Sequence, residues 1–186
     1  ISLKNSKLDI AKNYFENAIK INKQYVDSYN NLGVCLHELE KLDEAYEIFL
    51  DGFNIDTKNI KTLINLGNVL SLQDNVLEAI KIYNKALYFS PNNQEILSNI
   101  AICYCRENNE KDAKIYYDKA IKINPYDYKL MYAYCALQLK LNKFEKSWEL
   151  FNIVKEQNPV VLDSAEILKN PRELLKKLCD KLRIEF

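Results

Sequence analysis

Three stretches of the sequence decide the fold: YNNLGVCL at residues 29–36, LINLGNVL at 63–70 and LSNIAICY at 97–104. Each begins 34 residues after the one before it. In each, a bulky apolar residue comes first, an asparagine third and a small residue fifth. A spacing this regular indicates an internal repeat, in which every copy forms the same small unit and packs against its neighbours.

The period extends over four blocks that align without a gap: 26–59, 60–93, 94–127 and 128–161. The first half of each block carries one small column, formed by Gly33, Gly67, Ala101 and Cys135. The second half carries a small residue, an aromatic and a third, mostly small residue: Ala45, Phe49 and Gly52; Ala79, Tyr83 and Ala86; Ala113, Tyr117 and Ala120; Ser147, Phe151 and Val154. Proline closes three of the blocks, at Pro91, Pro125 and Pro159.

These columns predict a pair of helices in every block. Apolar residues recur at i, i+3, i+4 and i+7 in both halves, which is typical of amphipathic helices. Small residues let the axes of the two helices approach closely, and the aromatic fills the groove beside them. We expect helices over 26–39, 43–56, 60–73, 77–90, 94–107, 111–124, 128–141 and 145–158.

One such hairpin cannot bury both of its apolar stripes, so the blocks must stack. The order small, aromatic, small, proline over 34 residues resembles the tetratricopeptide repeat (TPR) family. The resemblance implies an all-α, right-handed superhelical solenoid of antiparallel hairpins over residues 1–161. Residues 1–25 are then a partial repeat, with Ala11, Phe15 and Ala18 in the register of a second helix and Ile1–Lys4 as the tail of its first.

Both ends of this array differ from its middle. Residues 162–186 leave the period, and we expect them to form C-terminal capping helices, with Leu174, Leu178 and Leu182 in one apolar stripe. The chain begins without a methionine, so we expect the natural N-terminus to be missing. The Ala11–Phe15 face should be partly uncovered, either because more repeats precede it or because a second copy covers it in a homo-oligomer.

The composition argues against several classes of partner. Twenty-six basic and 26 acidic residues cancel, which gives no global field for nucleic acid or an anionic membrane. No apolar run reaches the roughly 18–20 residues that a membrane span needs. The five cysteines are odd in number and lack a C-x-x-C pair, so we expect free thiols in a reducing, cytoplasmic compartment.

We expect no catalytic site, metal or cofactor. His37 is the only histidine and has no obvious second ligand, so it is interpreted as a partly exposed polar residue of the concave face. Cys103 and Cys105 stand two residues apart and cannot face each other on a helix. Sequence motifs for phosphate binding or hydrolysis are absent, and the three glycines all fall in packing columns.

The resemblance implies that a partner binds the concave face, which is lined by the first helix of each block. In this register the expected partner-binding residues are Asn30, Asn31, His37, Lys61, Asn65, Asn68, Asn99, Arg106, Lys129 and Tyr132. The lining does not favour the clamp with which co-chaperone TPR domains hold acidic chaperone tails. Ile64 and Ala133 stand where two of its cations belong, and charge-assisted bonds would be lost with them.

The column Asn31, Asn65 and Asn99 leaves two interpretations open. It resembles the asparagine ladder of TPR arrays attached to protein glycosyltransferases, where carboxamides pair with the backbone of an extended peptide. Asparagine also fills 22 of 186 positions, so the column can be a by-product of composition or of local packing. The function we expect is a non-catalytic scaffold or adaptor that binds a protein or peptide. The alternatives are the substrate-docking region of a larger enzyme, such as a glycosyltransferase, and a self-assembling module.

Overall fold

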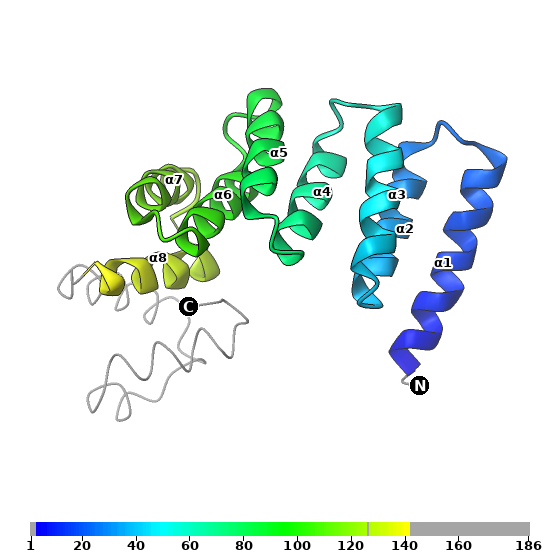
Figure 1. Ribbon diagram of the computed structural model, residues 1–186, viewed down its shortest axis with the longest axis horizontal. Coiled ribbons are helices and arrows are strands. Elements are labelled where there is room, and N and C mark those ends of the chain that lie inside the picture. Colours follow the sequence, from blue (N-terminus) through cyan, green and yellow to red (C-terminus); the bar gives the residue numbers. More distant parts are fainter. Residues whose placement is uncertain (1–2, 126, 142–186) are drawn as a thin grey trace. The chain divides into compact units, whose positions relative to one another are not determined.

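The computed structural model describes residues 3–125 and 127–141 of the chain (Figure 1). Its contacts divide the chain into two units, one ending at Pro91 and the other beginning at Asn92. Every regular element in the described part is an α-helix, as the period predicts.

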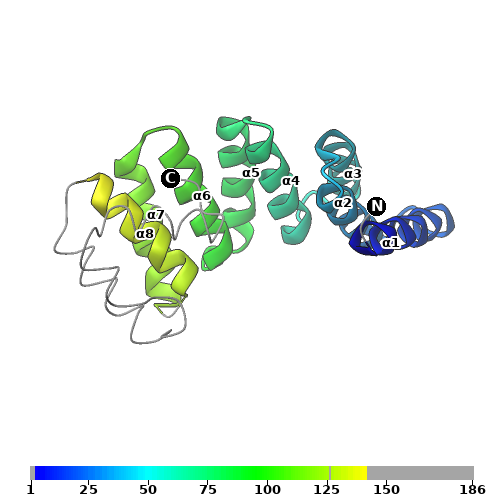
Figure 2. The same ribbon diagram turned by 90° about the horizontal axis from the view of Figure 1, so that it is seen from below.

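Five helices make up the first unit: α1 (Leu3–Ile21), α2 (Val26–Glu38), α3 (Leu42–Ile55), α4 (Ile60–Leu72) and α5 (Val76–Phe89). Helices α2 and α3 form one antiparallel hairpin, and α4 and α5 form the next (Figures 1 and 2). Helix α3 also packs against α4, and α2 contacts α4, so adjacent first helices lie side by side. Helix α1 packs against α2.

The second unit repeats this arrangement with α6 (Gln94–Arg106), α7 (Glu110–Ile123) and α8 (Tyr128–Lys140). Helices α6 and α7 form the hairpin, and α8 packs against both of them. The seven helices from α2 to α8 match the predicted helices to within one residue at every end. The helix expected at 145–158 and the capping helices expected at 162–186 lie outside the described residues.

One expectation about the N-terminus is wrong. Leu3 and Lys4 were assigned to a separate first helix, but they continue without a break into residues 9–21 as part of α1. The intervening residues Asn5–Leu8 contain neither glycine nor proline, so nothing in them ends a helix.

The hairpin seam is built as the small columns predict. The ring of Phe49 in α3 lies on Gly33 of α2, so that a Cβ atom at Gly33 would come within 2.4 Å of the ring. Tyr83 of α5 covers Gly67 of α4 in the same way, at 2.5 Å. Both aromatic side chains are only 2% exposed. Glycine is therefore required here by the close approach of an aromatic ring rather than by backbone conformation.

The turn between the two helices of a hairpin has the same backbone in every described repeat. Glu40, Asp74 and Asn108 occupy it with φ of 61°, 65° and 54°. The next residue donates its N–H to the carbonyl oxygen five residues before it, as in Lys41 to Leu36, Asn75 to Leu70 and Asn109 to Tyr104, each at 2.9 Å. This is the Schellman pattern, which satisfies the last free carbonyls of the first helix.

Asparagine or aspartate caps the start of α4, α6 and α8, whereas α2 begins after Tyr25 without a side-chain cap. Asn59 accepts a hydrogen bond from the N–H of Thr62 at 3.0 Å, and Asn93 accepts one from Ile96 at 3.1 Å. Asp127 does the same for Leu130. These side chains satisfy N–H groups that have no partner within the helix. Part of the asparagine content of the chain is thus used for capping.

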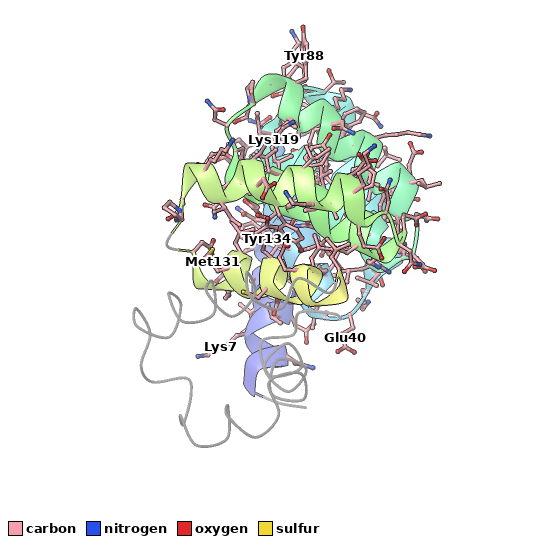
Figure 3. All side chains as sticks on the ribbon, turned by 90° about the vertical axis from the view of Figure 1, so that its left-hand side faces the viewer. Lys7, Glu40, Tyr88, Lys119, Met131 and Tyr134 are labelled. Carbon is pink, nitrogen blue, oxygen red and sulfur yellow. The ribbon has the colours of Figure 1, made fainter. Side chains whose placement is uncertain are left out.

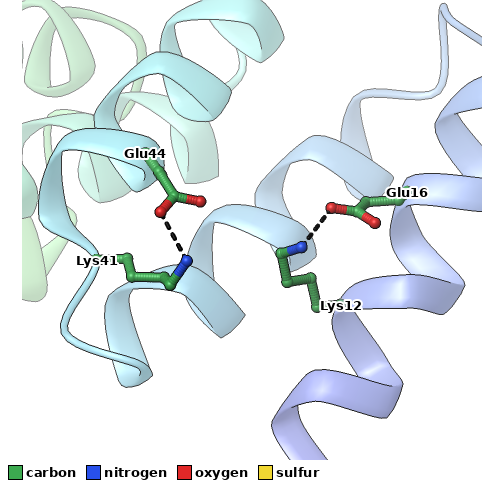
Figure 4. Close-up of polar contacts among 4 residues, drawn as sticks. All are labelled: Lys12, Glu16, Lys41 and Glu44. Atoms are coloured by element: carbon green, nitrogen blue, oxygen red, sulfur yellow. Dashed lines mark hydrogen bonds and ion pairs between the residues drawn. The ribbon is translucent and has the colours of Figure 1, made fainter.

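Charged pairs line the exposed rim between α1 and the α2–α3 hairpin. Lys12 bonds Glu16 on α1 and Lys41 bonds Glu44 at the start of α3, both with N–O distances of 2.7 Å (Figure 4). The bond to Glu16 raises the pKa of Lys12, and the charge of Glu44 on α3 adds to this effect. Within the described ranges, no helix is both long and apolar enough to cross a membrane.

Candidate partner-binding groove

The predicted binding residues lie on the first-type helices, α2 and α4 in the first unit and α6 and α8 in the second. A first-type helix is defined here as the first helix of a repeat. Since α2 contacts α4, and α6 contacts α8, each unit offers two adjacent helices to a ligand. The side chains differ in how far they are available.

Asn31 and Lys61 are brought together across two repeats. The Nζ atom of Lys61 on α4 donates to Oδ1 of Asn31 on α2 over 3.4 Å. Asn31 is half-buried and Lys61 is exposed, so both remain accessible. This polar contact bridges neighbouring first-type helices at the surface on which the groove was predicted.

Asn65 follows Lys61 by four residues and therefore lies on the same face of α4. It is half-buried, and its Nδ2 atom is buried without a hydrogen-bond partner in the structure. A buried amide donor without a partner costs about 1–3 kcal/mol. Asn65 is thus the residue of the groove with an unmet requirement for an acceptor.

Asn99 occupies the same position on α6 and is also half-buried. The prediction placed it in one column with Asn31 and Asn65. In the second unit it shares the surface of α6 with Arg106, which is half-buried as well. The asparagines of this column are therefore partly accessible in both units.

Asn68 is engaged inside its own hairpin. The hydroxyl of Tyr83 on α5 donates to Oδ1 of Asn68 over 2.6 Å. Since Tyr83 is the aromatic that covers Gly67, this bond fixes the ring from its far end. The structure gives Asn68 a role in holding the hairpin, in addition to any role at the surface.

Asn30 is not part of the groove, which corrects the prediction. It is 0% exposed, and both polar atoms of its side chain lack a partner in the structure. Helix α2 is covered by α1, α3 and α4. Its buried face is therefore wider than its stripe of apolar residues and includes the position of Asn30. The equivalent residue of α4, Ile64, is buried too.

Three of the four remaining predicted residues lie near helix ends. His37 and Arg106 are half-buried and fall in the last turn of α2 and α6, and the positive charge of Arg106 interacts favourably with the dipole of α6. Lys129 is exposed near the start of α8. Tyr132 belongs to the middle of α8.

The cysteines agree with their interpretation as small hydrophobic residues. Cys35, Cys103 and Cys135 are buried free thiols, and Cys105 is half-buried. Burial, together with the nearby Glu38 carboxylate, raises the pKa of Cys35 and so keeps it protonated. No group of metal-binding side chains occurs within residues 3–125 and 127–141.

Sequence reasoning missed a polar cluster between α7 and α8. The buried hydroxyl of Tyr134 donates to Oδ1 of Asp118 over 2.5 Å, and Asp118 also pairs with Lys114. Burial and then the bond to Asp118 raise the pKa of Tyr134 well above its usual range. Figure 3 shows Tyr134 between the helices and Tyr88 projecting into solvent. No signal in the apolar pattern points to this bond.

The stacked hairpins, their 34-residue period and the surface formed by the first-type helices define a class of protein, the helical-repeat interaction domains. The tetratricopeptide repeat matches the chain over residues 14–47, and again over 60–93 and 94–127. The chain belongs to the tetratricopeptide repeat family. No curated protein matches it in sequence.

Several solved structures share the fold. PilF of Pseudomonas aeruginosa has a TM-score of 0.78 at 18% identity, over 98% of this chain and 80% of that one. Residues 41 to the end of MamA from Desulfovibrio magneticus RS-1 give 0.76 at 14% identity, over 87% and 91%. YrrB, described as a TPR protein with an unusual peptide-binding site, gives 0.67 at 21% identity, over 78% and 75%. Similarity at this level establishes the fold alone.

Proposed function

We propose that this protein is an interaction scaffold that binds an extended peptide segment of a partner along its first-type helices. Tetratricopeptide repeats are in general non-catalytic scaffolds for protein interactions. The observation that carries the finer proposal is the buried Nδ2 of Asn65, which has no acceptor, beside the Lys61–Asn31 contact. A peptide carbonyl brought to α4 would supply the acceptor that the fold does not.

The spacing of the helices suits an extended ligand. Axes of neighbouring packed helices lie about 8–10 Å apart, and an extended chain rises about 3.3 Å per residue. Asn31 and Asn65 would therefore meet roughly every third residue of the peptide, whatever its side chains. The description of YrrB, a structural neighbour, as a TPR protein with an unusual peptide-binding site is consistent with a peptide ligand.

Selectivity would come from the charged and aromatic residues around the amides. Lys61, Arg106, Lys129 and Tyr132 were predicted for this task, and the exposed ammonium groups of Lys61 and Lys129 favour acidic side chains in the partner. The cysteines form no disulfide, which supports a reducing compartment. The scaffold would then work in the cytoplasm.

The test uses the amides. Partners are first captured with the whole chain and identified by mass spectrometry, and a peptide of the strongest partner is then titrated. We expect Asn65→Ala and Asn99→Ala together to weaken binding about tenfold or more, since two hydrogen bonds of roughly 1 kcal/mol each are lost. The melting temperature should stay nearly constant. Asn84→Ala, an exposed asparagine on α5, is the matched control.

Unchanged affinity in the Asn65→Ala, Asn99→Ala variant would contradict a role of these amides in binding. A fall in melting temperature without a change in affinity would assign them to packing instead. Either result leaves the scaffold function of the family intact and removes the peptide-backbone mechanism.

The asparagine column favours one second candidate, a substrate-docking region of a larger enzyme. Asn31, Asn65 and Asn99 recur at the same position of α2, α4 and α6, and this column resembles the asparagine ladder of glycosyltransferase-linked arrays. The full-length gene separates the two functions. A transferase domain in the same polypeptide would support the docking role, and its absence would support the free scaffold.

A further inference from the structure

The solvent-facing side of α7 carries one kind of charge. Its exposed residues are all lysine or isoleucine: Lys111, Ile115, Lys119, Lys122 and Ile123. From Lys111 to Lys122 they stand three or four positions apart, so they form one stripe along the helix. The isoleucines are 43% and 42% exposed, and Lys119 lies 5.0 Å from the centre of the Tyr116 ring. We call this surface the lysine stripe.

The acids of α7 do not neutralise the lysine stripe. Asp112 is half-buried and accepts a hydrogen bond from Nδ2 of the capping Asn109 at 2.7 Å. Asp118 is half-buried too, and it is engaged by Lys114 and by the hydroxyl of Tyr134. In the part of the chain that the structure describes, none of the three lysines of the stripe forms an ion pair. The stripe therefore keeps its positive charge.

The equivalent positions of α3 carry the opposite charge. The exposed residues of α3 are acids or asparagine: Asp43, Glu44, Glu47, Asp51 and Asn54. The helix contains no lysine or arginine, and of its acids Glu44 alone has a lysine partner among the residues with described positions. Asp43 bonds the neutral amide of Gln73, which leaves its charge in place. We call this surface the acidic stripe.

Each stripe also includes an aliphatic side chain. In α7, Ile115 stands between Lys111 and Lys119. In α3, the half-buried Leu50 follows Glu47 by three positions and precedes Asn54 by four, so it lies beside the acidic stripe. Aliphatic side chains that pack within a charged contact exclude water, and the ion pairs around them become stronger as a result.

We propose that the lysine stripe is a docking surface for the acidic stripe of a second copy of this chain. The two stripes have complementary charges, which favours their encounter and their specificity. The chain as a whole has 26 basic and 26 acidic residues, so two copies approach without net repulsion. Each copy carries both stripes. The contact is therefore heterologous, because a copy that receives one neighbour on α7 still offers α3 to another.

The competing occupants are an anionic lipid surface and an acidic segment of another protein. Neither is attracted over a long range by a chain whose charges cancel. The isoleucines of the stripe are less than half exposed, whereas a helix that lies in a membrane surface presents a broad apolar face. A second copy, in contrast, brings the complementary stripe at the same concentration as the lysines that it meets.

Sedimentation velocity of the whole chain over a range of concentrations tests the contact. At about 0.1 M salt the average mass should rise with protein concentration. It should return to that of the monomer at about 1 M salt, because the screening length falls from about 10 Å to about 3 Å. A chain that stays monomeric at every concentration in low salt would overturn the proposal.

Charge reversal assigns the contact to the two stripes. One variant carries Glu47→Lys with Asp51→Lys, and the other carries Lys111→Glu with Lys119→Glu. Each should weaken self-association about tenfold or more, because repulsion replaces attraction. A mixture of the two variants should associate again, since the intact lysine stripe of the first meets the intact acidic stripe of the second. All four residues are exposed, so the circular dichroism of each variant should not change.

Lys23→Glu with Lys58→Glu is the matched control. It changes the net charge by the same amount as the α7 variant, at exposed lysines outside both stripes, and should leave self-association unchanged. An equal loss in this control, or a mixture of the two stripe variants that stays monomeric, would overturn the contact between α3 and α7.

Vesicles that contain phosphatidylserine test the lipid alternative. Binding of the wild-type chain to them, without self-association in their absence, would overturn the proposal and assign the lysine stripe to an anionic lipid surface. None of these outcomes depends on the asparagines of the groove, so the two proposals succeed or fail separately.

Discussion

The α2–α3 and α4–α5 hairpins share one backbone and one packing scheme but use different chemistry at the seam. In both, an aromatic of the second helix lies on a glycine of the first. In α4–α5 the aromatic is Tyr83, and its hydroxyl bonds Asn68. In α2–α3 it is Phe49, and the position of Asn68 is taken by Val34, which is 41% exposed. The seam accepts an apolar pair or a hydrogen-bonded pair without a change in the fold.

This difference explains why Asn68 is bonded inside its own hairpin while Asn65, on the same helix, is not. Asn68 stands one helical turn after Asn65 on the same helix, yet its oxygen is engaged by Tyr83. Asn65 has a buried donor without an acceptor. Whether the aromatic of the second helix is tyrosine or phenylalanine therefore determines whether a polar residue at the position of Asn68 has a hydrogen-bond partner within the hairpin.

The largest effect is expected where the two hairpins are alike. Phe49→Ala and Tyr83→Ala each remove a ring that is 2% exposed and leave a cavity against glycine. We expect both to lower the free energy of unfolding by about 3–5 kcal/mol. Urea unfolding followed by circular dichroism measures this loss. A cost below 1 kcal/mol in either variant would show that its seam can collapse around the cavity.

Adding a methyl group under each ring should separate the hairpins. Gly33→Ala and Gly67→Ala place a Cβ at 2.4 Å and 2.5 Å from the ring, and overpacking of this kind costs about 1–3 kcal/mol. We expect Gly67→Ala to cost more, because the Tyr83 ring is held by Asn68 and cannot shift as the Phe49 ring can. Equal losses in thermal and urea unfolding would mean that the hydrogen bond does not restrain the ring.

Converting one seam into the other isolates the hydrogen bond. Tyr83→Phe should lower the free energy of unfolding by about 1 kcal/mol through loss of the bond to Asn68. The double variant Tyr83→Phe, Asn68→Val reproduces the pair Phe49 and Val34, and we expect it to regain most of this loss. A double-mutant cycle in urea gives the coupling. Strict additivity of the two substitutions would contradict a direct interaction.

Substitutions in the turns of the two hairpins should give the smallest change in the free energy of unfolding. Glu40 and Asp74 both have positive φ, a conformation that costs an ordinary side chain about 1–2 kcal/mol and aspartate less. Glycine removes this cost but loses more backbone entropy on folding. The net effect of Glu40→Gly should be to raise the free energy of unfolding by about 0.5–1 kcal/mol, and Asp74→Gly should raise it by less. The melting temperature reports both. A loss of stability in Glu40→Gly would show that its side chain contributes more to the turn than its backbone costs.

The helices and their seams were predictable from the sequence because both follow from local spacing. The number of residues that separates Gly33 from Phe49 also separates Gly67 from Tyr83. The periodic apolar stripe determines which residues face inward. The left-handed turn was not predictable, because glycine usually marks such a position and here Glu40, Asp74 and Asn108 occupy it. The regular position of the break still placed the helix ends to within one residue.

The groove was only partly predictable, since the face of a side chain follows from register and its partners do not. Asn30 was placed on the surface, yet it is buried because three helices surround α2. The pairing of Asn68 with Tyr83, and of Tyr134 with Asp118, depends on side-chain reach between helices. No one-dimensional pattern contains that information.

The tight turns have a kinetic consequence. The Tyr83–Asn68 and Tyr134–Asp118 bonds join residues 15 and 16 positions apart, and the Lys61–Asn31 bond between neighbouring hairpins spans 30. Contacts this local require little loop closure, so each hairpin can form quickly and without waiting for the rest of the chain. Opening is local for the same reason. Amide hydrogens of α1, which packs against α2 alone among the described helices, should exchange before those of α4, which packs against α2, α3 and α5.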